Sequence, residues 1–427
     1  MYNYTIIMQS KPFLALIKKL RTFLFLISFF ALAPTTVFSQ ISVPQWVDDL
    51  GGPGSSSSVP AAVKVDKQNN VYVTGIFQGT VDFDPSSGTH NLTSVGGSFD
   101  TYVAKFTSAG KLIWVVSFGG TGTDQVNSLG IDDNGNPSVT GQYDSQSMDI
   151  DPGSGITTLQ NNGDKDGFIV KFDTNGKFLW GKSIGGFDTD YGDKVIGDHA
   201  GNTIAMVQYQ STINIEGRTF SSAGSTFNGL MIKYDPNGNV LWAVNWSDSG
   251  DSEGRYMAVD ANNNILVDGV FDNAVNFNPL GGAVNLNGNG GSLFVGKYTP
   301  DGKLTWIKQV AGQAVNNNLN LCVDSKGNVF IDGPLSSTLT FNGNTTINPV
   351  SSQDIFIAKY NANGDFQVVK DIGAAGSSAY NYGIVASSKD EIYISGFFSG
   401  TVDFDPSPYF CGTNFRSRAT RSFFIEI

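Results

Sequence analysis

An all-β fold built from one repeated unit is predicted by three observations on the 427-residue sequence. Short apolar segments alternate with Gly- and Asn-rich turns, a four-strand pattern returns about every 64 residues, and helical periodicity is absent after residue 40. Turns such as Asn134-Gly135 and Asn237-Gly238 supply the positive φ that a tight hairpin needs. The chain is therefore expected to consist of antiparallel strands joined by tight turns.

Each repeat begins with a strand that ends in Asp, followed by a turn and a β-branched strand. These strand-ending residues are Asp66, Asp132, Asp198, Asp260 and Asp324, with Ser387 in a sixth copy. A third strand has Lys near its end, at Lys105, Lys171, Lys233, Lys297 and Lys359. The fourth strand is centred on a large ring, at Trp46, Trp114, Trp180, Trp242, Trp306 and Phe366. We expect each Asp to cap its own turn and each Lys to pair with an acid of its own repeat, for instance Lys105 with Asp66 or Asp82.

The strands are apolar on both faces, as in the runs 112–116 and 168–170. Both faces of each small sheet must then be covered, which favours sheets packed face to face around an axis. The sequence predicts a six-bladed β-propeller of four-stranded blades. The approximate repeats are 46–113, 114–179, 180–241, 242–305, 306–365 and 366–427.

Closure of the ring is predicted from the two ends of the repeat array. Residues 41–47 match a fourth strand that has no first three, and residues 423–427 match a third strand that has no fourth. Pairing the N-terminal strand into the last blade leaves no open sheet edge. Residues 40–427 are therefore expected to form one monomeric domain.

The first 39 residues have the pattern of a secretory signal peptide. Four bases (Lys11, Lys18, Lys19 and Arg21) precede an apolar run at 22–33, and the small residue Ser39 suits cleavage. The run is shorter than the roughly 20 residues that span a bilayer, so no membrane span is expected after signal removal. The predicted location is extracellular or at the cell surface, with the periplasm as the alternative.

The net charge excludes a nucleic-acid partner. It is −12 for the whole chain and, because the first 39 residues hold four bases and no acid, −16 after them. Affinity for phosphate backbones requires clustered cations, and no basic stripe is present in the sequence.

Three recurring phrases resemble the SBBP-type β-propeller repeat of secreted bacterial proteins. In the first copy they read Val71-Tyr72-Val73-Thr74-Gly75, Asp82-Phe83-Asp84-Pro85 and Tyr102-Val103-Ala104-Lys105-Phe106. The resemblance covers residues 41 to about 408, and the third copy diverges most. It implies an extracellular or cell-surface binding or scaffold module with no assigned catalytic motif.

Ligand recognition is predicted on the face that bears the long connections between second and third strands and the blade junctions. The long connections are 86–99, 153–165, 217–227, 280–291 and 343–353. At the junctions, acids recur beside aromatic residues, and the candidate ligand-binding residues are Asp124, Asp190, Asp251, Tyr191 and Tyr256. Such groups can bind a polysaccharide or a cell-envelope protein, whereas a merely solvated rim is the alternative interpretation.

The Asp-Phe-Asp-Pro phrases are weak calcium candidates. Their carboxylates are Asp82, Asp84, Asp149, Asp151, Asp403 and Asp405. Later copies carry Asn instead, as at Asn276 and Asn278. Because Asn and Asp both cap turns but only a carboxylate binds calcium well, a turn function is preferred. No cofactor is expected, with calcium as the alternative.

Catalytic residues are not predicted. The chain has two histidines, His90 and His199, which is too few for a multi-histidine metal site. A non-catalytic binding or scaffold module is therefore expected. One alternative is an extracellular hydrolase or lyase that uses carboxylates such as Asp124, Asp190 and Asp251, and strongly raised carboxyl pKa values in a deep axial pocket would favour it. The other alternative is a fragment of a larger cell-surface protein.

Overall fold

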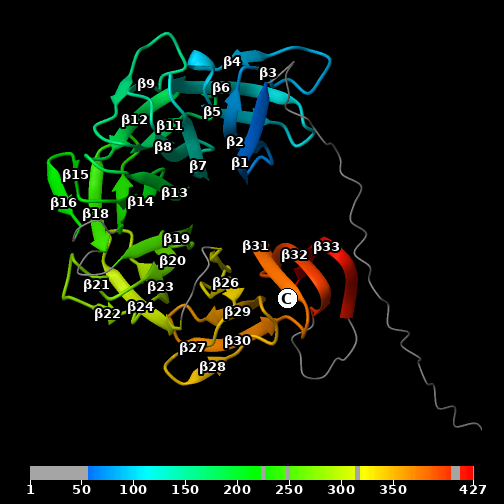
Figure 1. Cartoon of the computed structure of the whole chain (residues 1–427). Helices are drawn as coiled ribbons and strands as arrows, with labels where there is room; N and C mark the ends of the chain where they lie inside the picture. Colours follow the sequence, from blue (N-terminus) through cyan, green and yellow to red (C-terminus); the bar gives the residue numbers. More distant parts are fainter. Residues whose placement is uncertain (1–55, 223–226, 247–250, 313–317, 405–413, 427) are drawn as a thin grey trace, which may run out of the picture. The chain divides into compact units, whose positions relative to one another are not determined.

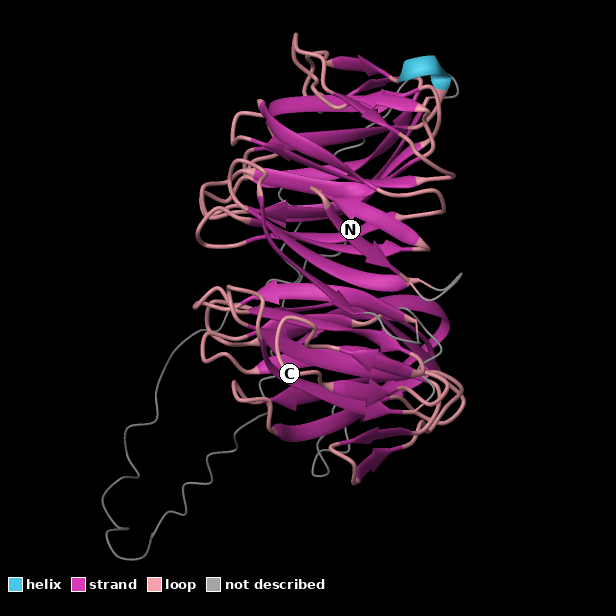
Figure 2. Ribbon diagram, turned by 90° about the vertical axis from the view of Figure 1, so that its left-hand side faces the viewer, coloured by secondary structure: helices cyan, strands magenta, loops and turns pink. Residues whose placement is uncertain are grey.

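The computed structural model describes residues 56–222, 227–246, 251–312, 318–404 and 414–426. Strands form almost all of the regular structure in these segments, as Figure 2 shows. The one helix among them is a short 3₁₀ turn, η1 (Val95–Gly97), before the third strand of the first sheet. The all-β prediction is confirmed.

Five sheets share one antiparallel four-strand order and follow one another along the chain (Figure 1). The first contains β1 (Ser57–Val65), β2 (Val71–Gln78), β5 (Asp100–Phe106) and β6 (Leu112–Gly120). The second contains β7 (Asp124–Ile131), β8 (Pro137–Tyr143), β11 (Asp166–Phe172) and β12 (Phe178–Ile184). The third contains β13 (Tyr191–Gly197), β14 (Thr203–Tyr209), β17 (Asn228–Tyr234) and β18 (Val240–Trp246). The fourth contains β19 (Ser252–Val259), β20 (Ile265–Phe271), β23 (Ser292–Tyr298) and β24 (Leu304–Ala311). The fifth contains β25 (Asn320–Val323), β26 (Val329–Leu335), β29 (Asp354–Tyr360) and β30 (Phe366–Ile372).

A sixth sheet has three strands in the described part of the chain: β31 (Ser378–Ala386), β32 (Ile392–Asp403) and β33 (Asn414–Glu426). Its third strand has the predicted register, because Tyr393 pairs with Glu426 as Tyr72 pairs with Lys105 in the first sheet. The predicted fourth strand, 41–47, lies outside the described residues.

The long connections between second and third strands differ from the prediction, because they contain two-stranded hairpins. The hairpins are β3 (Thr80–Asp82) with β4 (Asn91–Thr93), β9 (Ser147–Asp149) with β10 (Thr158–Gln160), β15 (Thr212–Ile215) with β16 (Arg218–Ser221), β21 (Ala274–Asn276) with β22 (Asn285–Asn287), and β27 (Leu339–Phe341) with β28 (Thr345–Ile347). In the first hairpin, Val81 and Phe83 alternate with polar residues and are fully buried against the sheet. Strands β9 and β27 also pair with β6 and β24, the outer strands of the preceding sheets.

The strand-ending Asp residues cap their own turns, as predicted. Asp66 Oδ1 accepts hydrogen bonds from the backbone N–H groups of Gln68 (2.9 Å) and Asn70 (2.8 Å). The same pair of bonds, to the second and fourth residues that follow, is made by Asp132, Asp198, Asp260 and Asp324. These carboxylates therefore fix the hairpin between the first and second strands.

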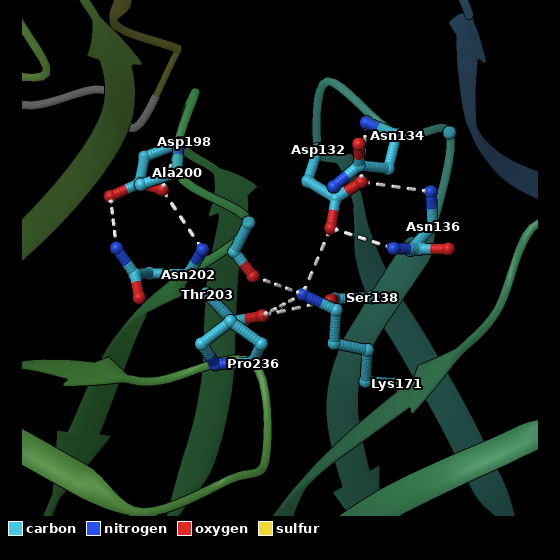
Figure 3. Close-up of polar contacts among 12 residues, drawn as sticks. Asp132, Asn134, Asn136, Ser138, Lys171, Asp198, Ala200, Asn202, Thr203 and Pro236 are labelled. Atoms are coloured by element: carbon cyan, nitrogen blue, oxygen red, sulfur yellow. Dashed lines mark hydrogen bonds and ion pairs between the residues drawn. The ribbon is translucent and has the colours of Figure 1, made fainter.

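The third-strand lysines pair with these acids in four of five copies, which confirms that prediction for them. The Nζ–Oδ2 distances are 3.6 Å for Lys105–Asp66, 3.1 Å for Lys171–Asp132, 2.8 Å for Lys233–Asp198 and 2.8 Å for Lys297–Asp260. In Figure 3, Lys171 also reaches the next sheet, where it donates to Gly201 O (2.7 Å) and Thr203 Oγ1 (3.2 Å). The fifth lysine, Lys359, lies over the Phe330 ring at 5.1 Å.

The fourth-strand tryptophans join consecutive sheets. Their indole N–H groups donate to a carbonyl in the third-to-fourth turn of the next sheet: Trp114 to Thr174 (3.1 Å), Trp180 to Pro236 (3.0 Å), Trp242 to Pro300 (3.0 Å) and Trp306 to Ala362 (3.2 Å). The turn position that lies against the indole ring must be glycine. At Gly302, φ is +81° and an added Cβ would lie 2.9 Å from Trp242.

Candidate functional site

The first strands of the sheets (β1, β7, β13, β19, β25 and β31) share an irregularity. The pairing register shifts by one residue in five of them, so that one residue bulges from the ladder. The bulged residues are Ala61, Asn127, Asp193, Arg255 and Tyr382. Each lies five positions before the strand-ending residue of its repeat, and Leu319 holds that position in the fifth copy. Bulges often re-aim a side chain near a binding site.

All six of these residues line one cavity of about 460 Å³, which we call the first-strand cavity. Its remaining lining comes from neighbouring residues on these strands and from Asn318, just before β25, and it includes Lys64, Lys194 and Tyr256. The six residues differ from one another, whereas the capping Asp and the paired Lys recur. A scaffold that repeats around a set of unlike side chains is suited to recognising one asymmetric ligand.

Charged groups in the cavity wall are only partly neutralised. Asp193 accepts from Gln208 Nε2 (2.9 Å) and lies 3.6 Å from Lys194 Nζ. Arg255 pairs with Glu253 on its own strand. Lys64 is exposed to the solvent of the cavity, and its pKa is lowered, first by partial loss of water around the amine. The second cause is the nearby charge of Lys194.

Two buried acids lie behind this wall on second strands. Burial raises the pKa of Asp332 to about 7, while hydrogen bonds from Asn320 and Asn381 (both 2.9 Å) oppose the rise. Asp268 pairs across the sheet with Tyr256, and burial raises its pKa well above the usual value, with Asp332 as the second cause. Neither residue lines the cavity. Asp268 therefore favours its protonated form near neutral pH, and Asp332 titrates close to neutral pH.

The predicted ligand-binding acids are placed differently from the cavity residues. Asp124 and Asp190 are fully buried at the start of the first strands or just before it. Asp124 accepts from Gly120 N (2.5 Å) and Ser145 Oγ (2.9 Å), and Asp190 accepts from Gly186 N (2.7 Å) and Gln210 N (3.0 Å). These bonds hold the sheet junctions.

The other predicted ligand-binding residues divide between the cavity and the junctions. Asp251 is half-buried and precedes β19, while Tyr191 packs on Phe227 with ring centroids 5.4 Å apart. Tyr256 lines the first-strand cavity. Ligand binding by any of the five stays a prediction.

The calcium candidates of the described hairpins take part in turns. Asp82 Oδ1 accepts from Asp84 N (3.0 Å) and His90 N (2.8 Å), and Asp149 Oδ1 accepts from Asp151 N (3.2 Å) and Thr157 N (2.9 Å). Asn276 Oδ1 makes the same two bonds, to Asn278 N and Val284 N. Asp84 and Asp151 each cap a following N–H. Asp405 lies outside the described residues, as does the Asp403 side chain. No group of three or more potential metal ligands occurs among the side chains described.

Three buried carboxyls near the sheet junctions, Asp100, Asp124 and Asp190, are expected to make the folded state more stable on mild acidification. Burial raises the pKa of Asp100 and Asp190 to about 7 and that of Asp124 to about 6. The folded state therefore holds these protons more tightly than the unfolded chain, so the stabilisation is complete below about pH 4 and is lost as pH rises to about 7. Asp198 and Asp260 have lowered pKa values, so their stabilisation is lost only below about pH 4.

We expect a higher Tm at pH 5 than at pH 8, measured by circular dichroism at fixed ionic strength. Asp100→Asn should reduce this difference, because the amide oxygen can still accept from Val95 N (2.7 Å) without titrating. The control Asp84→Asn should leave the difference unchanged, because the hydrogen bond from Ser86 lowers the pKa of the Asp84 carboxyl and keeps it ionised at both pH values. An equal or higher Tm at pH 8 would contradict the prediction.

Comparisons with known proteins give limited similarity. No protein-family model matches the chain. An uncharacterized WD repeat-containing protein of Acanthamoeba polyphaga mimivirus is 27% identical over 385 residues, covering 76% of this chain and 28% of that protein. The chain thus spans less than a third of the length of this relative. Among solved structures, the extracellular domain of a hybrid two-component system from B. thetaiotaomicron is 12% identical, with a TM-score of 0.18 over 83% of this chain and 58% of that one. A puromycin hydrolase is 11% identical, with a TM-score of 0.16 over 84% and 60%.

The first-strand cavity was not predicted from the sequence, although a signal for it exists. The position five residues before each strand-ending Asp or Ser varies inside an otherwise regular phrase. Residues that recur in every repeat build the scaffold, whereas residues that contact one asymmetric ligand differ between repeats. A search for recurring residues therefore passes over the ligand contacts.

No helix that is long and apolar enough to cross a bilayer occurs in the segments described.

Proposed function

We propose that the chain is a secreted, non-catalytic binding module: a six-bladed β-propeller, closed by its N-terminal strand, that holds a ligand in the first-strand cavity. The observation that carries the proposal is the set of six unlike residues at one repeat position that line this cavity. The relative with WD repeats supports the fold, because WD repeats form four-stranded propeller blades. The apolar run at 22–33 supports secretion, which N-terminal sequencing of the exported protein would test.

Exposure of β1 supports closure of the ring. Val63 is 61% exposed, whereas the residues at its repeat position in the other copies are 1–5% exposed: Leu129, Val195, Met257, Leu321 and Ile384. On the sixth sheet, Val385 is 55% exposed. A closed ring would bring these two apolar faces together and remove both from water.

Contacts between first-to-second turns support the same closure. A backbone N–H of one turn donates to a side-chain oxygen of the next, from His199 to Asn263 (2.9 Å) and from Ser325 to Asp390 (2.8 Å). Both acceptors have positive φ (61° and 65°), and Asn69 in the first turn has the same conformation (62°). In a closed ring, Ser388 N–H of the sixth sheet would donate to Asn69.

A filling substitution tests the binding site. Ala61→Trp places a large ring in the cavity, whereas Ser87→Trp places it on an exposed long connection of the same sheet. The full chain is screened by surface plasmon resonance against polysaccharides and cell-envelope proteins, with and without calcium. We expect a partner whose affinity falls at least tenfold with Ala61→Trp and is kept with Ser87→Trp. No partner, or the opposite pattern, would contradict the proposal, and the opposite pattern would favour the long-connection face.

A carboxylate-dependent hydrolase or lyase is the second candidate. The raised pKa values of Asp268 and Asp332 near the cavity favour it. These acids do not line the cavity, however, and the lining acid Asp193 is held by Gln208 and Lys194, so the binding function is better supported. The third candidate is a part of a larger surface protein. It is supported by the viral relative, of which this chain covers 28%.

A further inference from the structure

Two lysines in the wall of the first-strand cavity lack full compensation. Lys64 on β1 and Lys194 on β13 both line the cavity, and each repels the other. Lys194 lies 3.6 Å from Asp193, whose other oxygen is taken by Gln208. Among the described residues, no acid lies within ion-pair distance of Lys64. A like-charge pair in a confined space is stabilised when an anion enters between the two charges.

Aromatic rings lie beside the same cavity on the sixth sheet. Tyr382 lines the cavity and is 67% exposed. Its ring packs against Phe397 (centroids 5.4 Å apart), which stacks on Tyr380 at 4.5 Å and 10°. An exposed tyrosine held by packed neighbours presents a rigid apolar face with a polar tip. That surface suits the C–H face of a sugar ring.

Amide side chains complete the lining. Asn127 donates to Gly192 O (3.0 Å), which fixes its orientation, and Asn318 and Asn320 lie in the wall of the fifth sheet. Amides both donate to and accept from hydroxyl groups. The cavity therefore combines cations, an aromatic face and hydroxyl-binding groups within about 460 Å³, a volume in the usual range for small-ligand sites.

We propose that the first-strand cavity binds a uronic acid, with the carboxylate between Lys64 and Lys194 and the sugar ring against Tyr382. This inference rests on the proposed function and adds the chemical class of the ligand. Asp193 and Glu253 pair with Lys194 and Arg255, which leaves Lys64 as the lining cation without an acid at ion-pair distance among the described residues. Asp268 and Asp332 lie behind the wall, where burial raises the pKa of both carboxyls and so reduces their negative charge.

Isothermal titration of the full chain tests the inference with galacturonate and glucuronate, their neutral counterparts galactose and glucose, and inorganic phosphate. We expect one uronate to bind at least tenfold more tightly than its neutral counterpart and than phosphate. Lys64→Gln should remove this preference, and Tyr382→Ala should weaken the uronate at least fivefold. The matched control Lys67→Gln, an exposed lysine that pairs with Asp133 at 2.7 Å outside the cavity, should bind as the unaltered chain does.

Each other outcome overturns the inference. Equal binding of neutral sugars would remove the role of the cations, and phosphate binding as tightly as the uronates would leave an anion site without sugar recognition. If Lys64→Gln fails to fold by circular dichroism, Lys194→Gln replaces it, and an unchanged preference in the folded variant would contradict the proposal. If no uronate binds but a partner sensitive to Ala61→Trp is found, this inference fails while the proposed function stands. If the Ala61→Trp screen finds no partner, the proposed function fails.

Discussion

Lys171→Met is expected to lower the free energy of unfolding by about 3–5 kcal/mol, the usual cost of removing one partner from a buried ion pair. Lys171 and Asp132 are both about 1% exposed at the side chain and lie 3.1 Å apart. The substitution leaves the Asp132 carboxylate buried without its cation and also removes the bond to Gly201 O of the next sheet. Urea unfolding followed by tryptophan fluorescence measures the change.

The fifth copy provides a matched control for this substitution. Lys359 holds the same repeat position but is half-buried and lies over the Phe330 ring. Because Lys359→Met leaves no acid stranded in the described structure, a loss of about 1 kcal/mol or less is expected. The double variant Lys171→Met with Asp132→Asn should recover part of the loss. Equal losses at both lysines would show that the ion pair contributes little.

Contacts within one repeat could be predicted from the sequence because both partners recur at fixed spacing. The pair equivalent to Asp66 and Lys105 returns in five copies, and four of the five form the ion pair that the pattern predicts. Contacts between repeats were missed, such as Lys171 with Gly201 O and Trp114 with Thr174 O. Their acceptors are backbone carbonyls, which are present at every residue and leave no mark in the sequence.

The candidate site was harder to predict because the sequence does not show which way a carboxylate points. Asp124 and Asp190 recur at sheet junctions beside aromatic residues, yet their oxygens accept from nearby backbone N–H groups. Three residues further along the chain, Asn127 and Asp193 line the cavity because a bulge turns them out of the ladder. The spacing of the repeats predicts only a regular strand. The bulge is seen only when the pairing of the two strands is known.

Deletion of residues 41–50 is expected to unfold the protein or convert it into oligomers. In the proposed ring, this segment supplies the fourth strand of the sixth sheet, and it includes Trp46, which the repeat aligns with Trp114 and its equivalents. Without it, the edge of β33 would stay unpaired, and the apolar faces at Val63 and Val385 would remain in water. An open edge of this kind pairs readily with another chain.

Light scattering coupled to size exclusion, with circular dichroism for the melting temperature, distinguishes the outcomes for the deletion. A chain that begins at Gln40 is the control, because removal of the predicted signal alone should leave a stable monomer. A deletion variant that stays monomeric with an unchanged Tm would contradict closure by the N-terminal strand. Oligomers of the deletion variant that dissociate when a peptide with the sequence of residues 41–50 is added would favour closure, because the peptide could occupy the same sheet edge.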